Sequence, residues 1–167
     1  MTVLLNSESY QGLMMSDFKS IEFKDDKLIL IDQTKLPLEE IYIISDDYER
    51  IAVSIERLEV RGAPAIGITA AYGLALGVKN NSADKYQIIY DRLARTRPTA
   101  VNLFWALERL DKIYKSNIDT PHLYELLLNE AKKAGVKKFI YVSAFNADKL
   151  THLKMCHAKE LFVQELK

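Results

Sequence analysis

The sequence predicts an α+β fold, in which a small antiparallel sheet is followed by a helical bundle and then by a C-terminal strand–helix appendix. Near the start of the chain, apolar and polar residues alternate as they do on strands, and farther on apolar residues recur at helical spacing. The run KFIYVS at 138–143 is largely apolar and rich in β-forming residues, and a helical pattern follows it at 148–167. We therefore expect a loose N-terminal arm at 1–17, a principal domain at 18–130 and a tail at 131–167.

Three short strands are expected before the helices. Residues 20–24 and 28–32 flank the dipeptide Asp25-Asp26, which is the pattern of a β-hairpin, and 42–44 follows as a third strand. Pro37 lies in the link before this third strand and disfavours a helix there, because proline has no backbone N–H to donate.

Five helices are expected after the strands. Asp46 and Glu49 form a capping-box pattern at the start of the first, and Thr99 is the expected N-cap of the fourth. The fifth has Lys132 in its last turn and Gly135 just beyond it, as helix C-termini often do. The predicted helices span 47–59, 63–78, 85–94, 101–114 and 121–134.

The composition indicates a globular cytoplasmic protein. Of the 167 residues 49% are hydrophobic, which is enough to build a core, and Lys plus Arg equals Asp plus Glu at 23 each, which argues against a nucleic-acid partner. The single cysteine, Cys156, excludes an internal disulfide framework and suits a reducing compartment. The first residues lack a signal-peptide pattern, and the uncharged run at 63–78 is short for a membrane span, so no membrane partner is expected.

The stretch RGAPAIGITAAYGLALG at 61–77 predicts a buried helix with an exposed start. Arg61 and Gly62 come directly before this helix, and Pro64 falls in its first turn. A helix start gathers unpaired backbone N–H groups and the positive end of the helix dipole, and an adjacent arginine adds a full charge. The stretch therefore favours binding of an anion such as phosphate.

The segment RPTAVN at 97–102 repeats this arrangement. Arg97 and Pro98 precede another long helix with an apolar face. Either arginine could instead be a surface residue that hydrogen-bonds the C-terminus of a neighbouring helix, and this alternative stays open. Two such starts in one small domain favour a shared anion site.

Three segments together resemble a known family. They are LIDQTKLPLEE at 30–40, IERLEVRGAPAIGITAAYGLALG at 55–77 and RPTAVNLFWALERL at 97–110. The combination closely resembles the N-terminal domain of methylthioribose-1-phosphate isomerases, which share their fold with ribose-1,5-bisphosphate isomerases and with regulatory subunits of a translation-initiation exchange factor.

This resemblance implies an aldose–ketose isomerisation of 5-methylthioribose 1-phosphate in methionine salvage, with a sugar phosphate as the ligand and without a cofactor. Carried over by position, the resemblance implies that Arg61, Gly62, Ala63 and Arg97 bind the substrate. A general acid/base and a cysteine in an apolar site would move the proton between C2 and C1.

The family's catalytic segments are missing from this sequence. Its catalytic cysteine lies in a Thr-His-Cys-Asn-like segment and its catalytic aspartate in an Asp-Asn-like segment, and neither occurs here. Cys156 sits in KMCHAKE and is interpreted as a half-buried helix cysteine. Together with His152 and His157 it makes only a weak metal-binding pattern, so we expect neither a metal site nor a catalytic residue in this chain.

The tail at 134–167 resembles the middle of NmrA-like, atypical short-chain dehydrogenase/reductase proteins that bind NAD(P). In that family this stretch supplies a strand and the helix after it, with Ser143 near the cofactor. No glycine-rich dinucleotide fingerprint follows any strand in this sequence, so Ser143 is interpreted as structural. We expect a chimeric or truncated reading frame joined near 130–135.

Three hypotheses about function follow. The first is an isomerase homologue that holds the substrate but lacks the catalytic domain and is inactive alone. The second is a non-catalytic module that pairs with a full-length isomerase, or with itself as a homo-oligomer, through its apolar helical face. The third is an NAD(P)-dependent reductase fragment, which rests on the tail alone.

Overall fold

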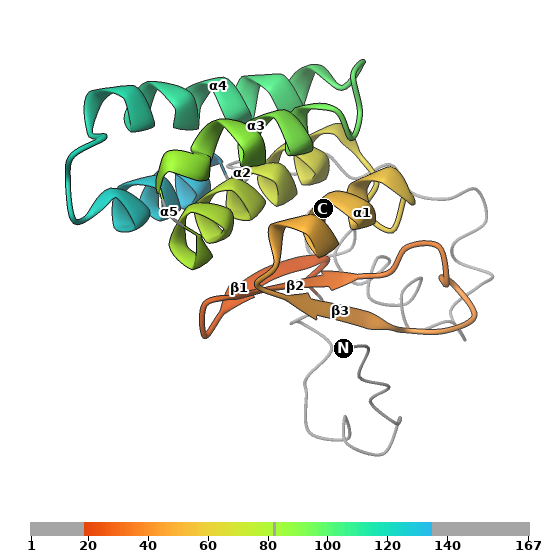
Figure 1. The fold of residues 1–167 in the computed structure, drawn as a ribbon. Coiled ribbons are helices and arrows are strands. Elements are labelled where there is room, and N and C mark those ends of the chain that lie inside the picture. The colour runs from red at the N-terminus through yellow and green to blue at the C-terminus, as the bar shows by residue number, and fades with distance from the viewer. Residues whose placement is uncertain (1–18, 82, 135–167) are drawn as a thin grey trace, which may run out of the picture.

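The computed structural model describes residues 19–81 and 83–134 and shows an antiparallel sheet followed by helices. The predicted α+β fold is therefore confirmed over these residues, whereas the predicted arm and the strand–helix appendix fall outside them. The elements, shown in Figure 1, are β1 (Ile21–Lys24), β2 (Lys27–Ile31), β3 (Tyr42–Ser45), α1 (Tyr48–Glu56), α2 (Ala63–Asn80), a short 3-10 helix (Ala83–Lys85), α3 (Tyr86–Ala94), α4 (Val101–Ser116) and α5 (Leu123–Ala134).

The sheet is a meander of three antiparallel strands in the order β1-β2-β3. The predicted hairpin turn is present, and both of its residues, Asp25 and Asp26, have positive φ values of 50° and 55°. One face of the sheet packs on the helices: Leu30 is 1% exposed, and the ring of Phe23 stacks on Tyr72 of α2 with 4.8 Å between ring centroids. The hairpin is thereby attached to the middle of the helical layer.

Helix α2 is the centre of the domain. It contacts the other four α-helices and β2, and every residue from Thr69 to Val78 is buried. The small residues on one face of α2 admit close neighbours from the same chain, because a Cβ added at Gly67 would lie 2.6 Å from the backbone oxygen of Asn102 in α4. Since this face of α2 is covered by the chain's own helices, an oligomer would have to use a different surface.

The start of α1 corrects one prediction. The N-cap is Asp47 and not Asp46: its carboxylate accepts hydrogen bonds from the backbone N–H groups of Glu49 and Arg50, at 3.0 and 3.4 Å. Asp46 belongs to the preceding link, where its backbone oxygen accepts a hydrogen bond from the side chain of Asn80 at 2.9 Å. With Asp47 at the cap, Glu49 falls one position too early to close a capping box.

The start of α4 corrects the prediction that Thr99 is its N-cap. Thr99 is exposed, and the N-cap is Ala100, which has no side chain that can cap. Residues 97–100 form a turn in which the N–H of Ala100 donates to the oxygen of Arg97 at 2.9 Å, so the helix begins one residue later than a Thr99 cap would place it. Within the part of the chain that the structure describes, no helix is long and apolar enough to cross a membrane.

Candidate functional site

The starts of α2 and α4 lie at the same end of the helical layer, on the right in Figure 1. The two helices run in the same direction and touch close to their first turns, where Gly67 meets the backbone of Asn102. The predicted anion-binding segments, at 61–63 and 97–102, are therefore brought together by the fold. What brings them together is a glycine at the crossing point, since any side chain there would push the helices apart.

The first residues of α2 are open to solvent. Gly62 is the N-cap, with φ +92°, and nothing lies within 4 Å of the position that a Cβ would take there. The oxygen of Gly62 accepts the first helical hydrogen bond, from Ile66 at 3.0 Å, and no side chain caps the helix. Ala63 is the first helical residue and is exposed, as is Pro64 after it.

The first turn of α4 is uncapped in the same way. Neither α2 nor α4 has an acidic residue in its first turn, whereas α1 has both the Asp47 cap and Glu49. The positive ends of the α2 and α4 dipoles are therefore not compensated by carboxylates of their own first turns. Such paired helix starts suit a phosphate group.

The two predicted arginines differ in their contacts. Arg61 is exposed, and its Nε donates to the backbone oxygen of Leu58 at 3.1 Å, just past the end of α1. This contact agrees with the alternative in which the arginine hydrogen-bonds a neighbouring helix end. Arg97 is half-buried, and its side chain makes no hydrogen bond or ion pair with the residues that the structure describes.

Neither of these arginines is paired with a described carboxylate, and this sets them apart from three others. Arg50 pairs with Glu59, Arg92 with two glutamates of α1, and Arg109 with Glu130 of α5. The guanidinium groups beside the starts of α2 and α4 are thus less neutralised than those of Arg50, Arg92 and Arg109.

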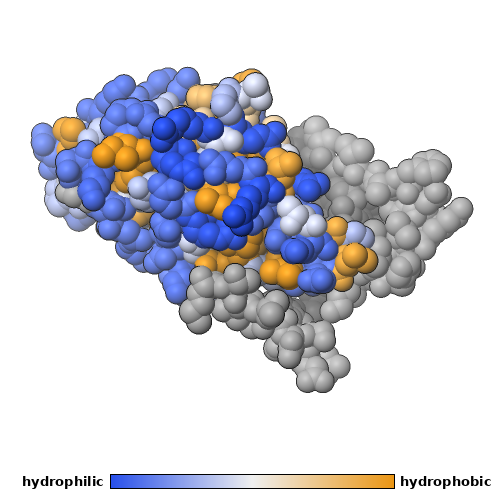
Figure 2. Space-filling model, turned by 45° about the vertical axis from the view of Figure 1, so that its right-hand side comes forward, coloured by the Kyte–Doolittle hydropathy of each residue, from blue (hydrophilic) through white to orange (hydrophobic). Residues whose placement is uncertain are grey.

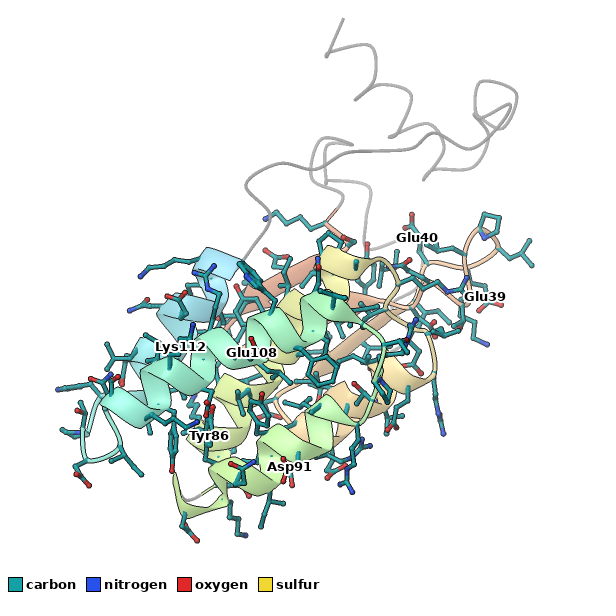
Figure 3. All side chains as sticks on the ribbon, turned by 90° about the horizontal axis from the view of Figure 1, so that it is seen from above. Glu39, Glu40, Tyr86, Asp91, Glu108 and Lys112 are labelled. Atoms are coloured by element: carbon teal, nitrogen blue, oxygen red, sulfur yellow. The ribbon has the colours of Figure 1, made fainter. Side chains whose placement is uncertain are left out.

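The segment at 30–40 reaches the same end of the molecule. Figure 3 shows Glu39 and Glu40 of this loop at the end where α2 and α4 begin. Asp32 is 8% exposed and accepts hydrogen bonds from the N–H and hydroxyl of Thr34, at 2.9 and 2.6 Å. The next residue, Gln33, donates its N–H to the oxygen of Glu59 at 2.9 Å, which attaches the loop to the link before α2.

Two residues that support this link, Arg50 and Glu59, were not among those selected from the sequence. Glu59 is 7% exposed and its carboxylate lies 2.7 Å from a guanidinium nitrogen of Arg50, which also donates to the hydroxyl of Ser54 at 2.7 Å. The only available signal was the position of Glu59, two residues before Arg61.

The groups with shifted pKa values lie elsewhere in the described residues. Burial, together with Asp111 of α4, raises the pKa of Tyr86 in the first turn of α3, and the hydrogen bonds from Lys79 and Tyr124 lower the pKa of Asp26 in the turn between β1 and β2. The described helix starts offer arginine side chains and backbone N–H groups, which suit the holding of an anion.

A shallow depression of about 440 Å³ lies on α3, lined by Ile88, Asp91, Ala94 and Arg95. It contains none of the residues predicted to bind substrate, and Ile88 on it is 62% exposed. Figure 3 shows Asp91 on the outer side of α3, away from the start of α2. This depression is therefore separate from the residues predicted to bind substrate.

Comparison with known proteins identifies the chain's relatives. It is 48% identical over 123 residues to the methylthioribose-1-phosphate isomerase of Geobacter sulfurreducens, covering 68% of this chain and 36% of that protein. It is 47% identical to the same enzyme of Caldicellulosiruptor saccharolyticus, covering 69% of this chain and 36% of that protein. The chain thus spans about a third of the length of the curated relatives it matches.

Two solved structures share the fold. The 5-methylthioribose 1-phosphate isomerase of Pyrococcus horikoshii matches with a TM-score of 0.68 and 35% identity, over 72% of this chain and 36% of that one. The delta subunit of translation initiation factor eIF-2B from A. fulgidus matches with a TM-score of 0.63 and 39% identity, over 71% of this chain and 36% of that one.

A family model matches residues 59–151, which include both predicted anion-binding helix starts. This match extends past the boundary predicted near 130–135, into residues that the structure does not describe. The chain belongs to the initiation factor 2 subunit family.

Proposed function

We propose that this chain is the substrate-holding part of a methylthioribose-1-phosphate isomerase. In this proposal Arg61, Gly62, Ala63 and Arg97 bind the phosphate of 5-methylthioribose 1-phosphate at the paired starts of α2 and α4. The names of the relatives support the choice of ligand, since they are isomerases of that sugar phosphate. The observation that carries the proposal is the pair of uncapped helix starts, each beside an arginine without a described carboxylate partner.

The expected contribution of each arginine is large enough to measure. A hydrogen bond to a charged group contributes about 1.5–3 kcal/mol, and about 1.4 kcal/mol changes a dissociation constant tenfold. Removing either guanidinium group should therefore weaken phosphate binding by about ten- to a hundredfold.

Calorimetric titration with ribose 1-phosphate tests this expectation. Arg61→Ala and Arg97→Ala should each weaken binding, and Arg57→Ala is the matched control because Arg57 is an exposed arginine at the C-cap of α1, outside the predicted site. Equal affinities in the wild type, Arg61→Ala and Arg97→Ala would refute the proposed site. An equal loss in Arg57→Ala would show that only the net charge of this end matters.

We propose further that the isolated chain has little or no isomerase activity. The two segments that carry the catalytic cysteine and aspartate in the family do not occur in this sequence. A coupled assay on the purified chain should therefore give at most background turnover of 5-methylthioribose 1-phosphate. Turnover comparable to that of a full-length isomerase would overturn this part of the proposal.

The remaining predictions belong with this proposal. A homo-oligomer, or pairing with a full-length isomerase, would use a surface other than the small-residue face of α2, and Figure 2 shows hydrophobic patches interspersed with hydrophilic ones on the face it displays. Light scattering with and without a full-length isomerase tests this pairing.

A cytoplasmic location and the NmrA-like character of the tail at 134–167 also remain proposals. Calorimetry with NAD(P) tests the proposal about the tail.

A further inference from the structure

Glu59 is a buried acid beside the proposed anion site. Its residue is 7% exposed, and it stands two positions before Arg61. An unpaired carboxylate at that place would repel a phosphate, so its partner matters for binding. The partner is Arg50 of α1, whose Nη1 lies 2.7 Å from Oε2 of Glu59.

The backbone of Glu59 is hydrogen-bonded on both sides, as its side chain is paired with Arg50. Its N–H and that of Val60 both donate to the oxygen of Ser54, at 3.0 and 3.3 Å, and its oxygen accepts from the N–H of Gln33 at 2.9 Å. Glu59 is therefore attached through its side chain to α1, through its N–H to the end of α1, and through its oxygen to the loop after β2.

These contacts lie between two unusual backbone conformations. Leu58, just before Glu59, has φ +60°, and Gly62, three residues after it, has φ +92°. Positive φ is disfavoured for leucine, so the conformation at Leu58 depends on the contacts that surround it. The contacts of Glu59 thus hold the residue that lies two positions before Arg61 and four before Ala63.

We infer that the Arg50–Glu59 ion pair positions the anion-binding link between α1 and α2. The pair holds residues 58–62 in one conformation, and Arg50 neutralises a carboxylate that would otherwise oppose the ligand. Glu59 and Arg50 are positioning residues in this role and do not touch the ligand themselves. The part of this inference that concerns ligand affinity rests on the function proposed above.

The substitution Glu59→Gln separates positioning from simple charge. If only charge mattered, removing a negative group beside the site would tighten phosphate binding. If Glu59 positions the link, the same substitution should weaken binding of ribose 1-phosphate by about tenfold, and Arg50→Lys, which keeps the charge, should weaken it less than Arg50→Met. Glu56→Gln is the matched control. It removes the ion pair between Glu56 of α1 and Arg92 of α3 and changes no residue of the link.

Amide signals in nuclear magnetic resonance spectra of the full chain give a readout that needs no ligand. Glu59→Gln should shift the Gly62 amide signal and speed hydrogen exchange at the Glu59 and Val60 amides, and Glu56→Gln should do neither. Unchanged Gly62 signals, or unchanged or tighter ribose 1-phosphate binding by Glu59→Gln, would overturn the inference. If the wild type itself fails to bind ribose 1-phosphate, the proposed function fails, and the amide signals still decide whether the ion pair positions the link.

Discussion

The two ends of helix α2 differ in how their polar groups are paired. At its C-terminal end Lys79 forms an ion pair with Asp26 at 2.5 Å, and the hydroxyl of Tyr124 donates to the same carboxylate at 2.6 Å. The side chain of Asn81 donates to the oxygen of Gly77 at 2.9 Å, which satisfies a carbonyl of the last turn. Hydrogen bonds at this end join the hairpin turn, α2 and α5.

At the N-terminal end no side chain caps α2, and the side chain of Arg61 hydrogen-bonds only the backbone oxygen of Leu58 among the described groups. The difference indicates which groups serve the fold and which are available to a ligand. Polar groups that stabilise tertiary structure pair with one another, whereas groups that bind a ligand must lack equivalent partners in its absence.

The largest expected effect comes from Gly67, which holds the two helix starts together. Gly67→Ala would place a Cβ 2.6 Å from the backbone oxygen of Asn102, which cannot rotate away. We expect a loss of about 3 kcal/mol in the free energy of unfolding, measured by urea denaturation. The comparison variant is Gly73→Ala, whose Cβ would meet a side-chain methyl of Ile51 at 3.0 Å, so that repacking should make the loss smaller. Equal losses in the two variants would contradict the prediction that the contact of Gly67 with the backbone of Asn102 tolerates a Cβ less well than the contact of Gly73 with a side chain.

An intermediate effect is expected from phosphate itself. A ligand that binds only the folded state stabilises it by about 1.4 kcal/mol at roughly ten times its dissociation constant. Inorganic phosphate should therefore raise the Tm of the wild type, whereas sodium chloride at equal ionic strength should not. The increase should be smaller in Arg97→Ala. If phosphate raises the Tm of both proteins equally, the stabilisation does not come from the proposed site.

The smallest effect is expected from Asp26 at the opposite end, and it depends on pH. The hydrogen bonds from Lys79 and Tyr124 lower the pKa of Asp26 from its usual 3.8. A carboxyl whose pKa is lower in the folded state contributes stability above the unfolded pKa, and this contribution is lost as the pH falls through the folded pKa. Acid unfolding curves should therefore show a loss of stability below pH ~4 that is reduced in Asp26→Asn. A steeper acid dependence in Asp26→Asn would contradict the assignment.

Local patterns predicted much of this fold. Alternation located the three strands, and apolar spacing located the five α-helices, because the side chains that repeat at those periods are the ones that become buried. The end of α1 at Glu56, earlier than predicted, could not be foreseen, since it follows from the turn at Leu58 and from two N–H groups that share the oxygen of Ser54.

The site was predictable only in part. Arg61 and Arg97 could be selected because each precedes a proline and a long helix. The pairing of Arg50 with Glu59 could not, because it joins residues nine apart on either side of a helix end and nothing local marks it. Two predicted caps were wrong for different reasons. Asp46 and Asp47 are adjacent aspartates, and Asp46 lies in the link that contacts Asn80, so Asp47 caps α1. At α4 the local turn at 97–100 moves the helix start to Val101, so Thr99 does not reach the cap position.

Helix α3 supplies none of the residues proposed to bind phosphate, yet it determines which end of α4 lies at the proposed site. Consecutive helices of this layer run in alternate directions (Figure 1). Because one α-helix, α3, lies between α2 and α4, the chain returns to the end where α2 began before α4 begins. Losing α3, or gaining another α-helix beside it, would reverse α4 and present a negative dipole end to the ligand. An odd number of α-helices between α2 and α4 is therefore as much a requirement of the proposed site as Arg61 and Arg97 are.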